Sequence, residues 1–318
     1  MSVIGTWRLV MSIILSTYGL AHAGIIFDGR LDDHDFSGYR ALEADGLLLT
    51  GVLAPNGIQT SLERVSDPAG SGRLVLKAAH IQGDLPTNGG YRSELNTFRD
   101  PVGSERWYSW GYYLPEAVKT AKNEVAIAQI HDTADVNESN ARNPTLAVLV
   151  DGDRLELVNA FDYDRVTSPP GSPAVAGVDY ERRELASWPL ETNDWTYLTL
   201  HVKWAADNTG FLEFWKDGTL LFQEKNHINT FNDERGVWFK TGLYDWSSHP
   251  ESISVYSTGV MIGDGRETLQ SMMSMSSLVP EQSMSAVPEP SVYLVMVAGL
   301  MVIGCFTCAG RGRTGKVR

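Results

Sequence analysis

Residues 195–204 read Trp-Thr-Tyr-Leu-Thr-Leu-His-Val-Lys-Trp and carry the clearest structural pattern of the chain. Leu198, Leu200 and Val202 occupy alternate positions, and residues with polar groups stand between them. A period of two is that of a β-strand with one buried face. Similar short apolar or alternating runs occur at residues 74–77, 107–114, 125–130, 146–150, 154–161, 211–216, 219–222 and 253–262.

Two Asp-Gly pairs, Asp151-Gly152 and Asp217-Gly218, each separate two of these runs. Such pairs are typical of tight β-hairpins. No long segment between residues 24 and 266 shows helical periodicity, and the strands do not alternate with helices. The sequence therefore predicts an all-β fold, an antiparallel jelly-roll sandwich in which one sheet is concave and forms a substrate groove.

The beginning of the chain has the order of a secretory signal peptide. Arg8 precedes an apolar run at residues 9–15, and Ala21-His22-Ala23 follows. This is the sequence of a charged region, an apolar region and a small-residue cleavage site. The alternative is an N-terminal membrane anchor, but the apolar run is shorter than the about 20 residues that span a bilayer. We expect residues 1–23 to be a signal peptide.

The end of the chain resembles the PEP-CTERM sorting signal of Gram-negative bacteria. Val287-Pro288-Glu289-Pro290 precedes an uncharged, mostly apolar run at 291–310 and a basic tail at 311–318. The resemblance implies a transmembrane segment at 287–318 and processing by an exosortase-type enzyme; a plain C-terminal anchor is the alternative. Either reading places the domain outside the cytoplasm, secreted or held at the cell envelope.

These end segments leave a single domain at 24–266, joined to the sorting signal by a Ser/Met-rich linker at 267–286. Both cysteines, Cys305 and Cys308, lie in the C-terminal segment, so the domain has neither a disulfide nor a cysteine metal site. The formal net charge of −13 argues against generic nucleic-acid binding, which needs clustered basic residues. An acidic protein can still act on an anionic polymer through a locally basic groove.

Three strand-like segments carry the candidate chemistry: Tyr91-Arg92-Ser93-Glu94-Leu95-Asn96, Ala128-Gln129-Ile130-His131 and Trp238-Phe239-Lys240-Thr241-Gly242-Leu243-Tyr244. In each segment the polar groups are two positions apart and share one face of a strand. If the three strands are neighbours, a cation, an amide, an imidazole and a phenol converge on one surface. This set suits the removal of a proton next to a carboxylate.

The three segments resemble, in order and in residues, the signatures of jelly-roll polysaccharide lyases. This group includes glucuronan lyases, heparin-lyase-I-like enzymes and alginate lyases, and the resemblance covers about residues 70 to 264. It implies a lyase that cleaves a uronic-acid-containing polymer by β-elimination. Trp-Tyr-Ser-Trp-Gly-Tyr-Tyr-Leu-Pro at 107–115 is nearer to the glucuronan and heparin-lyase-like members than to alginate lyases.

The reaction needs a group that neutralises the uronate carboxylate, a base for the C5 proton and an acid for the leaving oxygen. Arg92 and Gln129 suit the first task, His131 suits the base and Tyr244 suits the acid. One tyrosine serves both proton transfers where both groups lie on the same side of the sugar. His80 competes with His131 as the base. We expect further substrate contacts from His80, Glu94, Lys240, Tyr91 and Asn143.

Two other functions remain as alternatives. A non-catalytic carbohydrate-binding jelly-roll protein would present aromatic residues without the Arg, Gln, His and Tyr set. A jelly-roll glycoside hydrolase would need two suitably spaced carboxylates, and the sequence has no E-x-D-x-x-E strand. Each candidate side chain also has an ordinary structural explanation, as a surface ion pair or a satisfied polar pair on a sheet.

The chemistry needs no cofactor, and the sequence has no H-E-x-x-H or phosphate-binding loop. The resemblance allows a structural calcium ion far from the groove, held by oxygen ligands such as those of Asp28 and Asp264. We expect a monomer whose partners are an anionic polysaccharide and the processing enzyme. The sequence does not identify the uronate or distinguish endo from exo cleavage.

Overall fold

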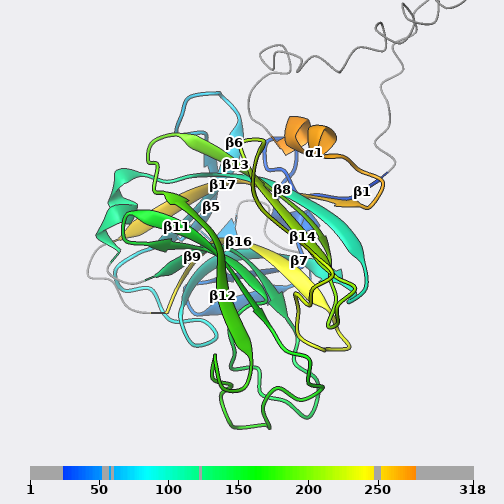
Figure 1. The fold of residues 1–318 in the computed structure, drawn as a ribbon. Coiled ribbons are helices and arrows are strands. Elements are labelled where there is room, and N and C mark those ends of the chain that lie inside the picture. Colours follow the sequence, from blue (N-terminus) through cyan, green and yellow to red (C-terminus); the bar gives the residue numbers. More distant parts are fainter. Residues whose placement is uncertain (1–23, 52–56, 59–60, 122–123, 247–251, 277–318) are drawn as a thin grey trace, which may run out of the picture. The chain divides into compact units, whose positions relative to one another are not determined.

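The computed structural model describes residues 24–51, 57–58, 61–121, 124–246 and 252–276. Almost all regular structure in this part of the chain belongs to two antiparallel sheets (Figure 1). Sheet A contains β1 (Ile25–Asp28), β4 (Gly57–Ile58), β5 (Leu62–Ser66), β6 (Leu74–His80), β8 (Glu105–Tyr113), β13 (Trp195–Lys203), β14 (Phe211–Lys216), β15 (Thr219–Lys225) and β17 (Ile253–Asp264). Its order is β15-β14-β13-β8-β17-β6-β5-β4, and β1 pairs with β17.

Sheet B supplies the second layer. It contains β2 (Ala41–Ala44), β3 (Leu47–Thr50), β7 (Tyr91–Asp100), β9 (Val125–Asp132), β10 (Leu146–Asp151), β11 (Arg154–Phe161), β12 (Glu181–Pro189) and β16 (Val237–Asp245). Its order is β12-β11-β10-β9-β16-β7-β2-β3. Two short 3-10 helices, η1 (Phe36–Gly38) and η2 (Glu116–Thr120), lie in connections. The predicted all-β antiparallel sandwich is confirmed.

Aromatic side chains join the two sheets at the centre of the core. Trp110 of β8 meets Phe239 of β16 edge to face, with ring centroids 5.0 Å apart, and Tyr108 stacks on Phe239 at 5.9 Å. All three are nearly or fully buried, and burial of such a ring stabilises a fold by roughly 1.5–3 kcal/mol. A hydrogen bond from Ser93 Oγ to the Ala79 carbonyl (2.5 Å) also connects sheet B to sheet A. Because Phe239 faces the core, its strand neighbours face away from it.

Both predicted hairpins are present. Asp151 pairs with Arg154 across the turn between β10 and β11, and Gly152 has a φ of +60°. Asp217 and Gly218, with φ of +48° and +77°, form the two-residue turn between β14 and β15. In this second turn both central residues have a positive φ, the conformation that Asp-Gly and Asn-Gly pairs adopt most readily.

The segment that we expected to be a Ser/Met-rich linker is partly folded. Helix α1 (Leu269–Ser276) begins two residues into it and packs on sheet A (Figure 1). Met272 is fully buried beside Trp107, and Ser276 Oγ lies 2.8 Å from Ser109 Oγ. The helix thus extends the folded unit past residue 266, the boundary expected from composition. The expected signal peptide at 1–23 and the sorting signal at 287–318 lie outside the described residues.

Candidate active site

The three candidate segments are neighbours in sheet B, where β16 lies between β9 and β7. Lys240 on β16 stands opposite Asn96 on β7 and Gln129 on β9, and Tyr244 stands opposite Arg92. Since Phe239 faces the core, these polar side chains share the outer face of sheet B. The arrangement expected from the alternation is therefore present.

This outer face contains a cavity of about 490 Å³. Five of the predicted site residues line it: Arg92, Gln129, His131, Asn143 and Tyr244. An apolar floor accompanies them, made of Ala126, Ala147, Leu149, Val158 and Ala160. The cavity thus offers polar groups beside a smooth apolar surface, which suits a ligand with both kinds of face, such as a sugar.

Glu94 is the buried carboxylate that connects the polar residues of the cavity. Its carboxylate is 2% exposed and accepts three hydrogen bonds. Arg92 Nη1 donates to Oε2 at 2.9 Å, Lys240 Nζ donates to the same oxygen at 2.8 Å, and Gln129 Nε2 donates to Oε1. Glu94 therefore holds the lining residues Arg92 and Gln129 in position, and Lys240 balances its charge. Neither Glu94 nor Lys240 is among the lining residues.

A second carboxylate, Glu43 of β2, completes this network and was not found from the sequence. It lies opposite Glu94 in the sheet, and its Oε1 is 3.0 Å from Lys240 Nζ and 2.7 Å from Asn96 Nδ2. Burial alone would raise the pKa of Glu43, but the charges of Lys240 and Arg92 outweigh it and lower the pKa to about 2. Two carboxylates thus balance two cations beneath the cavity.

Tyr244 and Arg92 are in direct contact. The guanidinium carbon of Arg92 lies 3.5 Å from the centre of the Tyr244 ring, a cation–π arrangement. Burial raises the pKa of Tyr244, and the Arg92 charge opposes this rise. Gly90 leaves room for the ring, because a Cβ at this position would collide with Tyr244. The phenol is therefore protonated at neutral pH and lies beside a cation that can stabilise its anion.

His131 lines the same cavity, and its side chain is 21% exposed. Its Nδ1 lies 2.9 Å from the Asp132 carbonyl oxygen, which selects the tautomer that carries its proton on Nδ1. The ring stacks on Trp238 with centroids 5.3 Å apart. Burial lowers the pKa of His131 despite the Asp132 charge, and Lys240 lowers it further. The imidazole is thus uncharged at neutral pH, with Nε2 able to accept a proton.

His80 and Tyr91 lie elsewhere. The His80 ring stacks on Tyr91 with centroids 4.5 Å apart, and its Nδ1 is 3.6 Å from Asp245 Oδ2. The His80 side chain is only 5% exposed, and neither His80 nor Tyr91 is among the residues that line the cavity. In the described part of the chain, His131 is therefore the histidine that reaches the cavity.

Several lining residues had not been singled out from the sequence. Tyr180 forms hydrogen bonds with Asn143, and Arg182 lies 3.6 Å from Glu124 at the far side of the cavity. Asn88 donates to Glu43 Oε2 at 3.0 Å from a turn that Thr87 and Gly90 close. Its Asn88-Gly89 pair is a hairpin signal that could have drawn attention to this position.

The calcium ligands suggested by the resemblance are already engaged. Asp28 pairs with Arg30 Nη2 at 2.8 Å, and Asp264 pairs with Arg266 Nη2 at 2.6 Å. A calcium ion needs six or more oxygen ligands, and at either position it would have to compete with the arginine that is paired with the carboxylate. Among the described residues, the carboxylates that lie close enough together to hold a metal ion are those of Glu124, Asp151 and Glu156, and Asp28 and Asp264 are not part of this cluster.

Comparison with known proteins decides the family. A polysaccharide lyase family model matches residues 32–260, which include all three candidate strands and both carboxylates beneath the cavity. The chain belongs to the polysaccharide lyase family. As a polysaccharide lyase it is an enzyme, and the family predicted from the three segments is confirmed. No curated protein matches the sequence.

Comparison with solved structures finds similarity to this polysaccharide lyase at low sequence identity, and the first of the two below shares its fold. The endo-β-1,4-glucuronan lyase of the fungus Trichoderma reesei has a TM-score of 0.57 and 20% identity, over 78% of this chain and 98% of that chain. The alginate lyase AlyC3 has a TM-score of 0.49 and 16% identity, over 72% of this chain and 91% of that chain.

The described residues contain no helix that is long and apolar enough to cross a membrane.

Proposed function

We propose that this polysaccharide lyase cleaves a uronic-acid-containing polymer, such as glucuronan or alginate, by β-elimination. The observation that carries the proposal is the cavity that Arg92, Gln129, His131 and Tyr244 line together. An amide, a guanidinium, an uncharged imidazole and a protonated phenol are the groups that the reaction needs. The glucuronan lyase that shares the fold acts on a polymer of this class.

The proposed reaction begins with the uronate carboxylate against Arg92 and Gln129. Glu43 and Glu94 already balance the charges of Arg92 and Lys240. The substrate carboxylate is therefore held by directed hydrogen bonds and not by a net positive charge. The same donors stabilise the enolate-like intermediate, in which a second negative charge develops beside the first. This electrostatic contribution is largest in a cavity that excludes water.

His131 Nε2 is the proposed base and removes the C5 proton. The electron pair of the C5–H bond forms the C4–C5 double bond, and the C4–O bond breaks with its pair on the departing oxygen. Tyr244 donates its proton to that oxygen. His131 is favoured over His80 because it lines the cavity, and its lowered pKa keeps the imidazole uncharged at neutral pH. The reaction uses protein groups alone.

A direct assay tests this function. The full-length protein is incubated with glucuronan, alginate and heparin, and the ultraviolet absorbance of the unsaturated product is followed. Carboxyl-reduced samples of the same polymers serve as controls, since they cannot stabilise the C5 carbanion. We expect absorbance to rise with at least one uronate polymer and with none of the reduced samples. Binding to these polymers without product would instead favour the carbohydrate-binding function.

We also propose that the enzyme is exported and reaches the cell envelope, where an exosortase-type enzyme processes its C-terminal segment. Support comes from the sequence at 1–23 and 287–318: an apolar run before Ala21-His22-Ala23, and Pro288-Glu289-Pro290 before an apolar run and a basic tail. Mass spectrometry of the protein from cell fractions tests this. A chain that retains both ends in the cytoplasmic fraction would contradict it.

A further inference from the structure

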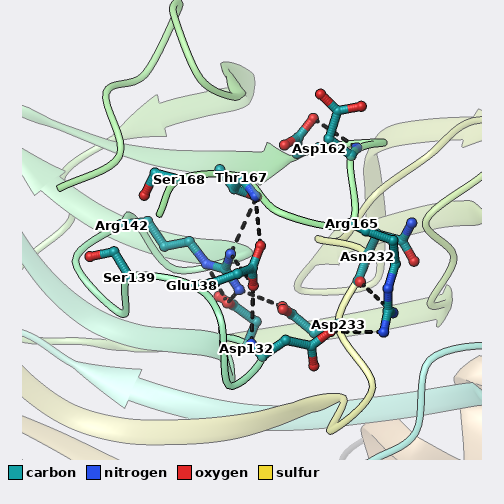
Figure 2. Close-up of polar contacts among 12 residues, drawn as sticks. Asp132, Glu138, Ser139, Arg142, Asp162, Arg165, Thr167, Ser168, Asn232 and Asp233 are labelled. Carbon is teal, nitrogen blue, oxygen red and sulfur yellow. Dashed lines mark hydrogen bonds and ion pairs between the residues drawn. The ribbon is translucent and has the colours of Figure 1, made fainter. Parts of the chain in front are cut away.

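Arg142 is a buried guanidinium surrounded by acceptors at one end of the cavity. Its side chain is 1% exposed. Nε donates to Asp132 Oδ2 at 2.7 Å, Nη1 lies 3.3 Å from Glu138 Oε2, and Nη2 donates to both Asp132 and Asp233 (Figure 2). The Phe231 ring covers the group, 4.2 Å from its central carbon. Such a planar fork can hold several carboxylates in fixed directions.

The partners of Arg142 come from separate segments of the chain. Asp132 ends β9, Glu138 lies in the loop that follows, and Asp233 lies between β15 and β16. Thr167, between β11 and β12, accepts from Arg142 Nη1 at 3.3 Å and donates its backbone N–H to Glu138 Oε1 at 2.6 Å. Arg142 therefore connects three loops to Asp132 (Figure 2), the last residue of the strand that carries His131.

Two of these loops form a wall of the cavity. The backbone N–H of Ala174 donates to the Ala141 carbonyl at 3.0 Å, and the Tyr180 hydroxyl bonds to Asn143. Ala141, Asn143, Ala174 and Tyr180 all line the cavity. The position of this wall thus depends on the loop that Arg142 holds.

His131 depends on the same anchor through Asp132. The Asp132 carbonyl accepts from His131 Nδ1 at 2.9 Å, and Asp132 Oδ1 lies 3.5 Å from that nitrogen. The other carboxylate oxygen is held by Arg142, and Thr145 Oγ1 lies 3.5 Å from Oδ1. A shift of Asp132 would therefore alter both the direction of the imidazole and the charge that it senses.

We propose that Arg142 is a positioning residue of the lyase, which fixes Asp132 so that His131 is held in its reactive tautomer and direction. The proposal rests on the proposed β-elimination for its catalytic consequence. Its other consequence, a change in the pKa of His131, can be measured without any substrate. Arg142 is among the residues that line the cavity, but its side chain is 1% exposed and protein acceptors engage its N–H groups, so we assign it a role through Asp132.

The charges around His131 predict the direction of that consequence. Asp132, Lys240 and Arg92 act on the imidazole electrostatically, and Trp238 stacks on it. Removing Arg142 leaves the Asp132 carboxylate without its cation, so Asp132 attracts a proton onto His131 more strongly. We therefore expect the pKa of His131 to rise in an Arg142→Gln variant.

The test compares Arg142→Gln, Arg142→Lys and Arg165→Gln in the full-length protein. Arg165 is the matched control, because it bridges Asp135 and Glu234 in the same loops but its side chain is 52% exposed. NMR titration of the His131 ring gives its pKa, and initial rates on the active polymer give kcat, KM and their pH profiles. Circular dichroism reports whether each variant is folded.

We expect Arg142→Gln to lower kcat about 100-fold, as displacement of a catalytic group by about 1 Å does, with a much smaller change in KM. The His131 titration and the acid limb of the rate profile should move together to higher pH. Arg142→Lys keeps the charge and should restore the titration and part of the rate. Arg165→Gln should match the wild type within about twofold.

A folded Arg142→Gln variant with wild-type kcat and His131 titration would overturn the proposal. Equal losses in Arg142→Gln and Arg165→Gln would also overturn it, since they would indicate general loosening of the loops. If Arg142→Gln does not fold, Arg142→Lys decides the question through its titration and its kcat. Absence of activity in the wild type would refute the β-elimination, while the titration would still test the link between Arg142 and His131.

Discussion

The Arg92 guanidinium carbon lies 3.5 Å from the centre of the Tyr244 ring. The two residues are opposite each other on neighbouring strands, so the sheet register itself produces the contact. A cation at this position stabilises the phenolate more than the phenol. In the proposed β-elimination, Arg92 therefore serves two groups at once, the uronate carboxylate and the tyrosine that gives up its proton.

Arg92→Lys should expose this double role. Lysine keeps the charge but loses the planar stack and one directed hydrogen bond. We expect kcat to fall about 10- to 100-fold and the pKa of Tyr244 to rise. The control is Arg154→Lys, because Arg154 pairs with Glu156 and Glu184 outside the cavity and is 42% exposed. An unchanged rate in Arg92→Lys would contradict the role given to Arg92.

Tyr244→Phe should remove the proton donor and leave the ring packing intact. A positioned general acid contributes typically about 10²–10⁴-fold, so kcat should fall by about 10³-fold with KM little changed. Tyr163→Phe is the matched control, since Tyr163 is 52% exposed and outside the cavity. Initial rates and circular dichroism measure both effects. A rate within tenfold of wild type would exclude Tyr244 as the acid.

His131→Ala and His80→Ala distinguish the two candidate bases. His131 lines the cavity and His80 packs against Tyr91 and Asp245, so only His131→Ala should lower kcat by about 10³-fold. His80→Ala should mainly lower thermal stability, because it removes a buried ring. A lowered His131 pKa also places the acid limb of kcat/KM below pH 6.5, the ordinary histidine value. The reverse order of rates would reassign the base to His80.

The buried acids around Arg142 predict a pH-dependent stability. Burial and the neighbouring Asp132 raise the pKa of Asp233 to about 8, although Arg142 opposes the rise. Folded Asp233 therefore keeps a proton that the unfolded chain releases near pH 4, and the free energy of unfolding falls as pH rises from about 4 to 8. One proton corresponds to at most about 1.4 kcal/mol per pH unit.

Asp233→Asn cannot titrate and should flatten this dependence. Its amide keeps the shape of the protonated acid and a donor for the neighbouring carboxylate. Denaturant unfolding at several pH values between 5 and 8 gives, for the wild type and for the variant, the slope of the free energy of unfolding against pH. Parallel curves for the wild type and the variant would show that Asp233 is ionised throughout this range.

Treatment with a chelator tests the expectation that the reaction needs no metal ion. The proposed steps use Arg92, Gln129, His131 and Tyr244, and the suggested calcium ligands Asp28 and Asp264 are each paired with an arginine. We expect EDTA, followed by removal of the chelate, to leave kcat and the melting temperature unchanged. A loss of either that calcium restores would show that an ion binds and matters.

The sequence predicted the fold and the central strands because their signals are local. Alternation identified the strands around Gln129 and Lys240, and Asp-Gly pairs marked the turns at 152 and 218. Because a strand has a period of two, the face that each polar residue occupies follows from its position. The convergence of Arg92 and Tyr244 then required only that the three strands be neighbours.

The remaining features depend on long-range contacts. Glu43 lies in a four-residue strand, and only its pairing with β7 brings it under Lys240. The partners of Arg142 come from several loops, and no spacing in the sequence connects them. Helix α1 is short, and the burial of Met272 against sheet A stabilises it. The composition of the segment does not reveal this contact and therefore indicated a linker. Such elements are stabilised by tertiary packing rather than by local preference.

The masses of the reaction products test the central claim most directly. A defined uronate oligosaccharide is incubated with the full-length protein, and the fragments are measured by mass spectrometry. β-Elimination adds no water, so the fragment masses should sum to the mass of the substrate, with an unsaturated uronate at one new end. A sum greater by one water would show hydrolysis, and it would contradict the roles assigned to His131 and Tyr244.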